Sequence, residues 1–161
     1  MRIWHWCILA AVAAYFIFGN SSKMPLDELD RYDSKAPLEK SSQHIGASCY
    51  KDRCLMIYVA PWCTYCRRSH QAILSTVKTL ESRGIPVFVV LGMDKIDKLK
   101  DYAAEFPFPV YFDRDRHFFH HLNGKGVPYF VTWTRGGKIL KHVAGGFTEE
   151  NQLIQYLELT N

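Results

Sequence analysis

The chain has 161 residues, of which 48% are hydrophobic, and its formal net charge is +4 at pH 7. This length and hydrophobic content predict one domain with an ordinary core. The 20 basic and 16 acidic residues are scattered along the chain. A strongly basic stripe of the kind that binds nucleic acid is therefore excluded, and we expect no nucleic-acid partner.

The N-terminal stretch is apolar. Residues 3–18 contain no charged side chain, and Arg2 precedes them. As a helix they would reach about 24 Å at ~1.5 Å per residue, a little short of the ~30 Å hydrocarbon core of a membrane. We predict a single-pass inner-membrane anchor over residues 1–22, with the remaining chain in the periplasm. The alternatives are a signal peptide cleaved near Ala11-Val12-Ala13, which would leave a soluble secreted or periplasmic protein, and a buried core helix.

Residues 23–48 are polar and rich in serine. We expect a linker that holds the domain off the membrane, with short helices around residues 26–32 and 38–45. The alternative is an extension that packs on the domain. The domain itself is predicted at residues 49–161.

Cys49 and Cys54 flank a short segment in which Asp52 favours a tight turn. A disulfide between them requires Cα atoms about 4.4–6.8 Å apart. We predict a structural disulfide. The alternatives are two free thiols, or a second functional pair that relays electrons or binds metal together with Cys63 and Cys66. A strand over residues 55–60 opposes the metal alternative, because it would separate Cys54 from Cys63 by about 20 Å.

Cys63 and Cys66 lie where a predicted strand passes into a predicted helix. Residues 55–59 form an apolar run rich in β-branched and aromatic side chains, which is typical of a buried strand. Residues 69–81 carry apolar side chains at helical spacing. The free amides and the dipole of a helix N-terminus stabilise an anion, and the thiolate is the reactive form of cysteine. We therefore interpret the pair as a redox dithiol in which Cys63 attacks and Cys66 resolves.

Further elements follow in chain order. The pattern predicts a strand over 85–91 parallel to the first, a helix over 94–105, a short strand over 110–112, helical turns over 116–123, a hairpin of strands 129–134 and 138–144, and a last helix that begins at Thr148.

The motif Trp62-Cys63-x-x-Cys66 after a hydrophobic strand resembles the thioredoxin superfamily. Gly126-Val127-Pro128 is similar to the cis-proline loop of that family, and residues 108–113 resemble its TlpA-like, membrane-anchored periplasmic branch. The resemblance covers residues 55–159 and implies the α/β thioredoxin fold, a mixed central β-sheet flanked by helices.

The resemblance also implies how a substrate would bind. A cis bond before Pro128 would leave the backbone of Val127 free to pair with an extended peptide. Trp62 and Tyr65 would form an apolar rim. The implied partners are a protein thiol or disulfide substrate and an upstream redox partner, and no cofactor is expected.

The chain departs from reducing thioredoxins at Ile57, where they carry a buried carboxylate. Tyr65 before the second cysteine is similar to the Dsb group. Redox direction depends on the relative thiolate stability of the pair. The TlpA-like resemblance favours protein-disulfide reduction, and Dsb-type oxidation or isomerisation is the alternative.

Four histidines deserve a functional and a structural interpretation. His70 follows Cys66 by four residues and either tunes the dithiol or only packs. His117, His120 and His121 have the spacing of a metal-binding helix face, but a partly solvated helix explains them too, and no metal site is predicted. A non-catalytic copper- or zinc-handling module remains the alternative function from a different class.

Overall fold

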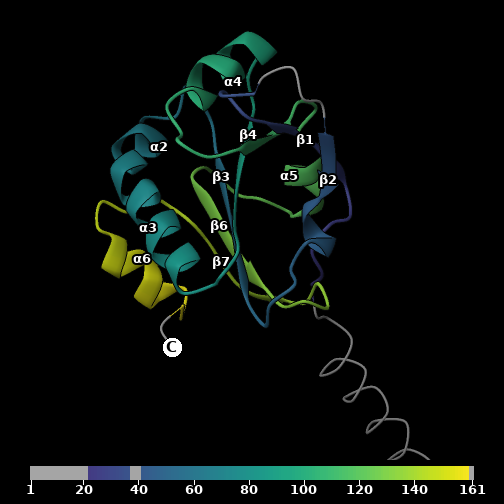
Figure 1. The fold of residues 1–161 in the computed structure, drawn as a ribbon, viewed down its shortest axis with the longest axis vertical. Coiled ribbons are helices and arrows are strands. Elements are labelled where there is room, and N and C mark those ends of the chain that lie inside the picture. Colours follow the sequence, from purple (N-terminus) through teal and green to yellow (C-terminus); the bar gives the residue numbers. More distant parts are fainter. Residues whose placement is uncertain (1–21, 37–40, 160–161) are drawn as a thin grey trace, which may run out of the picture.

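Figure 1 shows the computed structural model, which describes residues 22–36 and 41–159. Its centre is a seven-stranded mixed sheet with the strand order β2-β1-β5-β4-β3-β6-β7. The strands are β1 Glu28–Tyr32, β2 Ser41–His44, β3 Cys54–Val59, β4 Val87–Gly92, β5 Val110–Asp113, β6 Tyr129–Trp133 and β7 Ile139–Ala144. The helices are η1 Ile45–Ala47, α2 Thr64–Arg68, α3 His70–Ser82, α4 Ile96–Ala103, α5 His117–His121 and α6 Glu150–Tyr156.

Strand β3 is the central element of the sheet. All six of its residues are buried. It pairs in parallel with β4 and antiparallel with β6, and β6 forms a hairpin with β7. The predicted α/β architecture, with a mixed sheet flanked by helices, is therefore confirmed.

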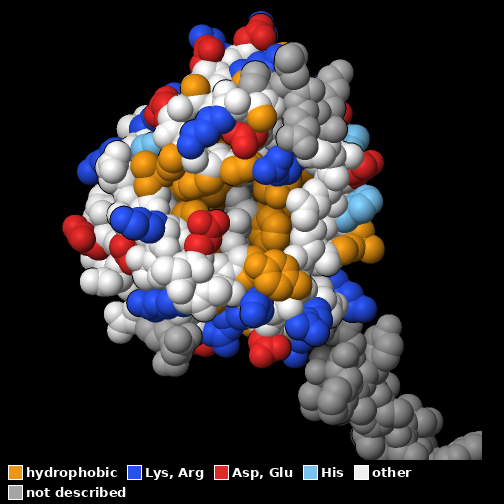
Figure 2. All heavy atoms as spheres, in the orientation of Figure 1, with side chains coloured by type: hydrophobic (Ala, Val, Ile, Leu, Met, Phe, Trp, Pro, Cys, Tyr) orange, Lys and Arg blue, Asp and Glu red, His pale blue; other side chains and the backbone are white. Residues whose placement is uncertain are grey.

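The core is divided between the two faces of the sheet, because successive side chains of a strand point to opposite sides. Leu55 and Ile57 of β3 pack under α2, α3, α4 and α6, whereas Met56 and Tyr58 pack on the side of α5. Figure 1 shows α2, α3 and α6 on the left of the sheet and α5 on its right. In the same view, hydrophobic side chains gather in a strip along the middle of the visible face, and charged side chains surround it (Figure 2).

The prediction of a short helix around residues 26–32 is wrong, and so is the prediction around 38–45 for its described part, Ser41–His44; residues 38–40 lie outside the described residues. Strand β1 pairs antiparallel with β5, and β2 pairs with β1, so both extend the sheet. Leu29 is the only fully buried residue of β1, and no residue of β2 is buried. Strand β2 forms the sheet edge and β1 lies beside it. Both bury few side chains, so they carry little of the apolar alternation on which a sequence-based assignment depends. Strands β1 and β2 therefore pack on the domain, as the alternative prediction of a packed extension stated, and do not form a free linker.

The predicted membrane anchor lies almost wholly outside the described residues, which begin at Ser22. Within residues 22–36 and 41–159, no helix is long and apolar enough to cross a membrane.

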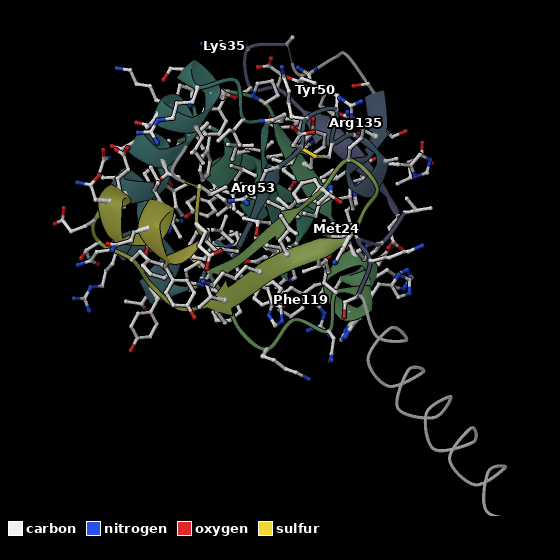
Figure 3. The ribbon with its side chains drawn as sticks, turned by 90° about the horizontal axis from the view of Figure 1, so that it is seen from below. Met24, Lys35, Tyr50, Arg53, Phe119 and Arg135 are labelled. Carbon is white, nitrogen blue, oxygen red and sulfur yellow. A yellow bond between two sulfur atoms is a disulfide. The ribbon has the colours of Figure 1, made fainter. Side chains whose placement is uncertain are left out.

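The predicted disulfide between Cys49 and Cys54 is confirmed, with Cα atoms 5.8 Å apart. Both residues are buried. The bond lies close to Tyr50 and Arg135 (Figure 3), and the Arg135 guanidinium donates a hydrogen bond to the Tyr50 carbonyl. Since β3 begins at Cys54 and ends before Cys63, the two cysteine pairs lie at opposite ends of the strand, about 20 Å apart. They cannot share a metal ion.

Replacing both Cys49 and Cys54 by Ala should lower the free energy of unfolding by about 2 kcal/mol, because the bond closes a short loop in the unfolded chain. Urea denaturation under non-reducing conditions measures the difference. A reductant that opens the bond in the parent protein should remove most of the difference between the two proteins. A double variant as stable as the parent would show that the bond does not stabilise the fold.

Candidate active site

Cys63 caps the helix that begins after β3. It is the N-cap residue of α2, with extended backbone angles (φ −78°, ψ 113°), and its Sγ accepts a hydrogen bond from the Cys66 amide at 3.1 Å. An oxygen of Ser, Thr, Asp or Asn usually occupies this position. Here a sulfur does, so the free amides of the helix N-terminus point at an atom that becomes negatively charged when the thiol ionises.

Cys66 lies behind Cys63 in the core. It has no exposed surface, whereas Cys63 is 4% exposed and borders a groove. Both are free thiols. Burial raises the pKa of the Cys66 thiol, and the hydrogen bond with the Cys63 side chain raises that pKa further. At neutral pH Cys66 is therefore a protonated thiol, and Cys63 is the sulfur within reach of a substrate.

The groove beside Cys63 has a volume of about 460 Å³. Two strongly exposed aromatic side chains, Trp62 (61%) and Tyr65 (63%), stand on the dithiol side of it. The residues that line the groove are Trp62, Cys63, Thr64, Tyr65, Met93, Phe119, Gly124, Lys125, Gly126 and Val127. The groove thus combines apolar and aromatic walls with one exposed cation.

The loop before β6 forms the wall opposite the dithiol. The peptide bond between Val127 and Pro128 is cis, as the family resemblance implies. The Cys63 thiol lies 3.4 Å from the Val127 carbonyl and donates to it. The Val127 amide has no hydrogen-bond partner among the described residues. The structure therefore brings together Trp62, Cys63, Tyr65 and Val127 around one groove, with the buried Pro128 directly behind.

The loop after β4 holds Trp62 in place. The Trp62 indole donates a hydrogen bond to the Met93 carbonyl at 2.9 Å, and Met93 has a left-handed backbone conformation (φ 64°). Gly92 before it has no room for a side chain, because a Cβ atom there would lie 1.8 Å from the Tyr58 hydroxyl. Sequence reasoning missed Met93. The parallel pairing of β3 and β4 was the available signal, since the carboxyl ends of parallel strands meet at one edge of a sheet.

A buried carboxylate fixes the far wall of the groove. Asp113 is 3% exposed and accepts hydrogen bonds from the Tyr58 hydroxyl at 2.9 Å and from the amides of Phe118 and Phe119 at 3.3 and 3.0 Å. Burial, together with the charge of Asp113, raises the pKa of Tyr58, so this phenol remains a neutral donor. The arrangement holds Phe119 against the groove, and Asp113 and Phe119 were not identified from sequence.

Further contacts fix the dithiol helix. The Ser69 hydroxyl, between α2 and α3, accepts a hydrogen bond from the Phe147 amide at 3.0 Å. Gly146 lies so close that a Cβ atom there would be 3.3 Å from Tyr65. Arg67 donates to the Pro61 carbonyl at 3.0 Å and forms an ion pair with Glu105, which links the turn before Cys63 to the end of α4.

The histidines of α5 lie on an exposed helix face. His117, His120 and His121 are all exposed. His121 Nδ1 lies 2.8 Å from the Asp27 carboxylate and connects α5 to the segment before β1. Within the part of the chain that the structure describes, no three His, Cys, Asp or Glu side chains are grouped to hold a metal ion.

Comparison with known families identifies the fold's relatives. Residues 44–161 match the family model described as a thioredoxin-like domain, so the chain belongs to the thioredoxin-like family. A comparison with curated proteins gave no match.

Solved structures share the fold at low sequence identity. The dsbF protein of Mycobacterium tuberculosis is 13% identical with a TM-score of 0.66, over 87% of this chain and 97% of that one. A secreted disulfide oxidoreductase of the same organism is 12% identical with a TM-score of 0.63, over 81% and 95%. The exposed lipoprotein thioredoxin Etrx1 of Streptococcus pneumoniae is 15% identical with a TM-score of 0.62, over 83% and 100%. At these identities the likeness establishes the fold alone.

Iodoacetamide added to the reduced protein at pH 7 should label Cys63 and leave Cys66 unmodified, because burial keeps Cys66 protonated and inaccessible. Mass spectrometry of the peptide that carries both cysteines measures the labelling. In a Cys63→Ala variant the same peptide should remain largely unlabelled. Preferential labelling of Cys66 would contradict the roles that the geometry gives the two sulfurs.

Proposed function

We propose that the protein is a thiol–disulfide oxidoreductase that acts on protein disulfides through Cys63 and Cys66. The observation that carries the proposal is the unequal placement of the two sulfurs. Cys63 Sγ accepts the Cys66 amide at the start of α2 and borders the groove, while Cys66 is fully buried behind it. Cys63 can react with a substrate disulfide. Cys66 can react only with the mixed disulfide that Cys63 has already formed.

The reaction proceeds in two exchanges. The Cys63 thiolate attacks one sulfur of a substrate disulfide, the substrate bond breaks, and one substrate cysteine leaves as a thiolate. A mixed disulfide now joins Cys63 to the other substrate cysteine. Cys66 then attacks the Cys63 sulfur, which releases the second substrate thiol and leaves an internal disulfide. An upstream dithiol partner restores the reduced protein by the reverse exchange.

The groove supports an extended protein substrate. The Val127 amide, which has no partner among the described residues, and the Val127 carbonyl offer backbone hydrogen bonds to a peptide strand, the mode by which sheet edges bind extended segments. Trp62 and Tyr65 would contact the side chains that flank the substrate cysteine, because both are more than half exposed at the groove. Pro128 holds this loop from behind.

We place the reaction in the reducing direction and in the periplasm or another exported compartment. The TlpA-like sequence features favour reduction. Export is supported by the apolar residues 3–18 and by the Cys49–Cys54 disulfide, since such bonds persist in oxidising compartments. The two named neighbours described as secreted and as an exposed lipoprotein agree with this placement.

Cys63→Ala should abolish reduction of a protein disulfide in an assay coupled to excess reductant, because the variant lacks the attacking sulfur. Cys66→Ala should instead accumulate a mixed disulfide with the substrate, which non-reducing gel electrophoresis separates by mass. The Cys49→Ala/Cys54→Ala protein is the matched control and should retain activity. Full activity of Cys63→Ala would exclude the proposed function.

The reduction potential of the Cys63–Cys66 pair decides the direction. We expect a value near the −270 mV of thioredoxin, measured by equilibration with glutathione or dithiothreitol buffers. A value near −120 mV, typical of a strong oxidant, would indicate a disulfide donor instead.

A further inference from the structure

Two buried polar atoms near the dithiol lack a hydrogen-bond partner. Among the described residues, these are the Nδ1 atom of His70 and the hydroxyl of Tyr102. Unpaired buried polar groups are uncommon in folded proteins, and each calls for an explanation. The Thr76 hydroxyl and the Trp133 indole nitrogen also lack a partner among these residues, but Trp133 lies opposite Cys54 at the far end of β3 and Thr76 follows Cys66 by ten residues.

His70 lies one helical turn after Cys66. Helices α2 and α3 are interrupted only at Ser69, whose amide donates to the Tyr65 carbonyl at 3.0 Å and whose carbonyl accepts from the Ile73 amide at 2.9 Å. The ladder lacks the bond from the His70 amide to the Cys66 carbonyl, but Ser69 keeps right-handed helical backbone angles (φ −83°, ψ −4°), so His70 follows Cys66 by about one turn. Residues four apart on a helix share a face, with Cβ atoms about 5–6 Å apart. The imidazole thus lies on the Cys66 side of the helix, where one water molecule can connect its Nδ1 atom to the thiol.

Helix α4 and the residues after it enclose the imidazole. The His70 ring centroid lies 4.8 Å from that of Phe106 and 6.0 Å from that of Tyr102. The Arg67 guanidinium carbon lies 4.1 Å from the centroid of the Tyr102 ring on the same side of the dithiol helix. Cys66 is therefore separated from bulk solvent on this side by a small aromatic cluster that contains one imidazole.

The other titratable groups of this cluster are not available to accept a proton. Burial and the nearby Cys66 raise the pKa of Tyr102, so its phenol stays neutral. Arg67 and Glu105 form an ion pair with one another. Ile57, in the same core cluster as Cys66, is apolar. Among the described residues of the cluster, the imidazole is left as the group with a free lone pair.

We propose that His70 accepts the proton of Cys66 in the resolving exchange, an inference that rests on the proposed function. Cys66 gives its proton to His70 Nδ1, and the resulting thiolate attacks the Cys63 sulfur. The mixed disulfide breaks, and the substrate cysteine leaves as a thiolate. The imidazolium then passes the proton to that thiolate or to water, and the reverse exchange returns a proton to Cys66 by the same route.

The test separates the two exchanges in one experiment. Reduced protein is mixed rapidly with dithiobis(nitrobenzoate), whose thiolate product absorbs visible light. Attack by Cys63 releases a first coloured thiolate, and resolution by Cys66 releases a second. All proteins carry Cys7→Ser, so that this thiol does not contribute, and Cys66→Ala serves as the blank without a second phase.

His70→Gln should slow the second phase by at least about tenfold and leave the first unchanged, since a positioned general base contributes ~10²–10⁴-fold. Its second phase should also rise about tenfold per pH unit, because only the ionised fraction of Cys66 then attacks. His70→Phe keeps an aromatic ring against Phe106 and should show the same loss. His120→Gln, an exposed histidine of α5, is the matched control and should match the parent.

Each outcome has one meaning. An unchanged second phase in both His70 variants overturns the inference and leaves the proposed function intact. Equal slowing of both phases, together with a lower melting temperature, would show that His70 has only a structural role and also overturns it. A parent protein whose Cys63 releases no thiolate contradicts the proposed function itself.

Discussion

The site depends on one constraint, which is that β3 runs directly into α2 with almost no connecting chain. A buried strand that ends at Val59 delivers Cys63 to the first position of a helix, and the helical turn then carries Cys66 inward. Two chemically identical side chains thereby acquire different environments. The helix amides serve one sulfur, and the apolar core surrounds the other. The order of events in the proposed exchange follows from that difference alone.

The sequence was sufficient for the elements that bury apolar side chains with a clear period. Strand β3, the parallel strand β4 and the helix after the dithiol all follow from runs and spacings of apolar residues. The Cys49–Cys54 bond follows from spacing as well. The cis bond before Pro128 did not follow from spacing, because proline tolerates both isomers, and the family resemblance was needed to expect it.

The sequence did not reveal the features that are determined by backbone pairing or by contacts between residues far apart in the chain. Strand β2 forms the sheet edge and β1 lies beside it. Strand β2 buries no side chain and β1 buries only Leu29, so the polar residues there gave no strand signal. Met93 and Phe119 reach the groove only because β4 and β5 end at the edge where α2 begins. Those positions are neighbours in the fold and distant in the chain, and no local pattern marks them.

The two sides of the groove differ in how their buried polar groups are paired. Fully paired groups have a structural role, whereas an unpaired group can take part in the reaction. On the far side, Asp113 accepts three hydrogen bonds and Tyr58 donates one of them, which leaves neither group free to exchange a proton with a ligand. A fully paired network of this kind makes a wall rigid. Behind the dithiol, the buried Nδ1 atom of the half-buried His70 and the buried hydroxyl of Tyr102 have no partner among the described residues. A fold that satisfies a buried carboxylate so completely on one side gains nothing in stability from unpaired groups on the other. Proton transfer from Cys66, whose thiol must ionise out of contact with water, is the role that we propose for the unpaired His70 nitrogen.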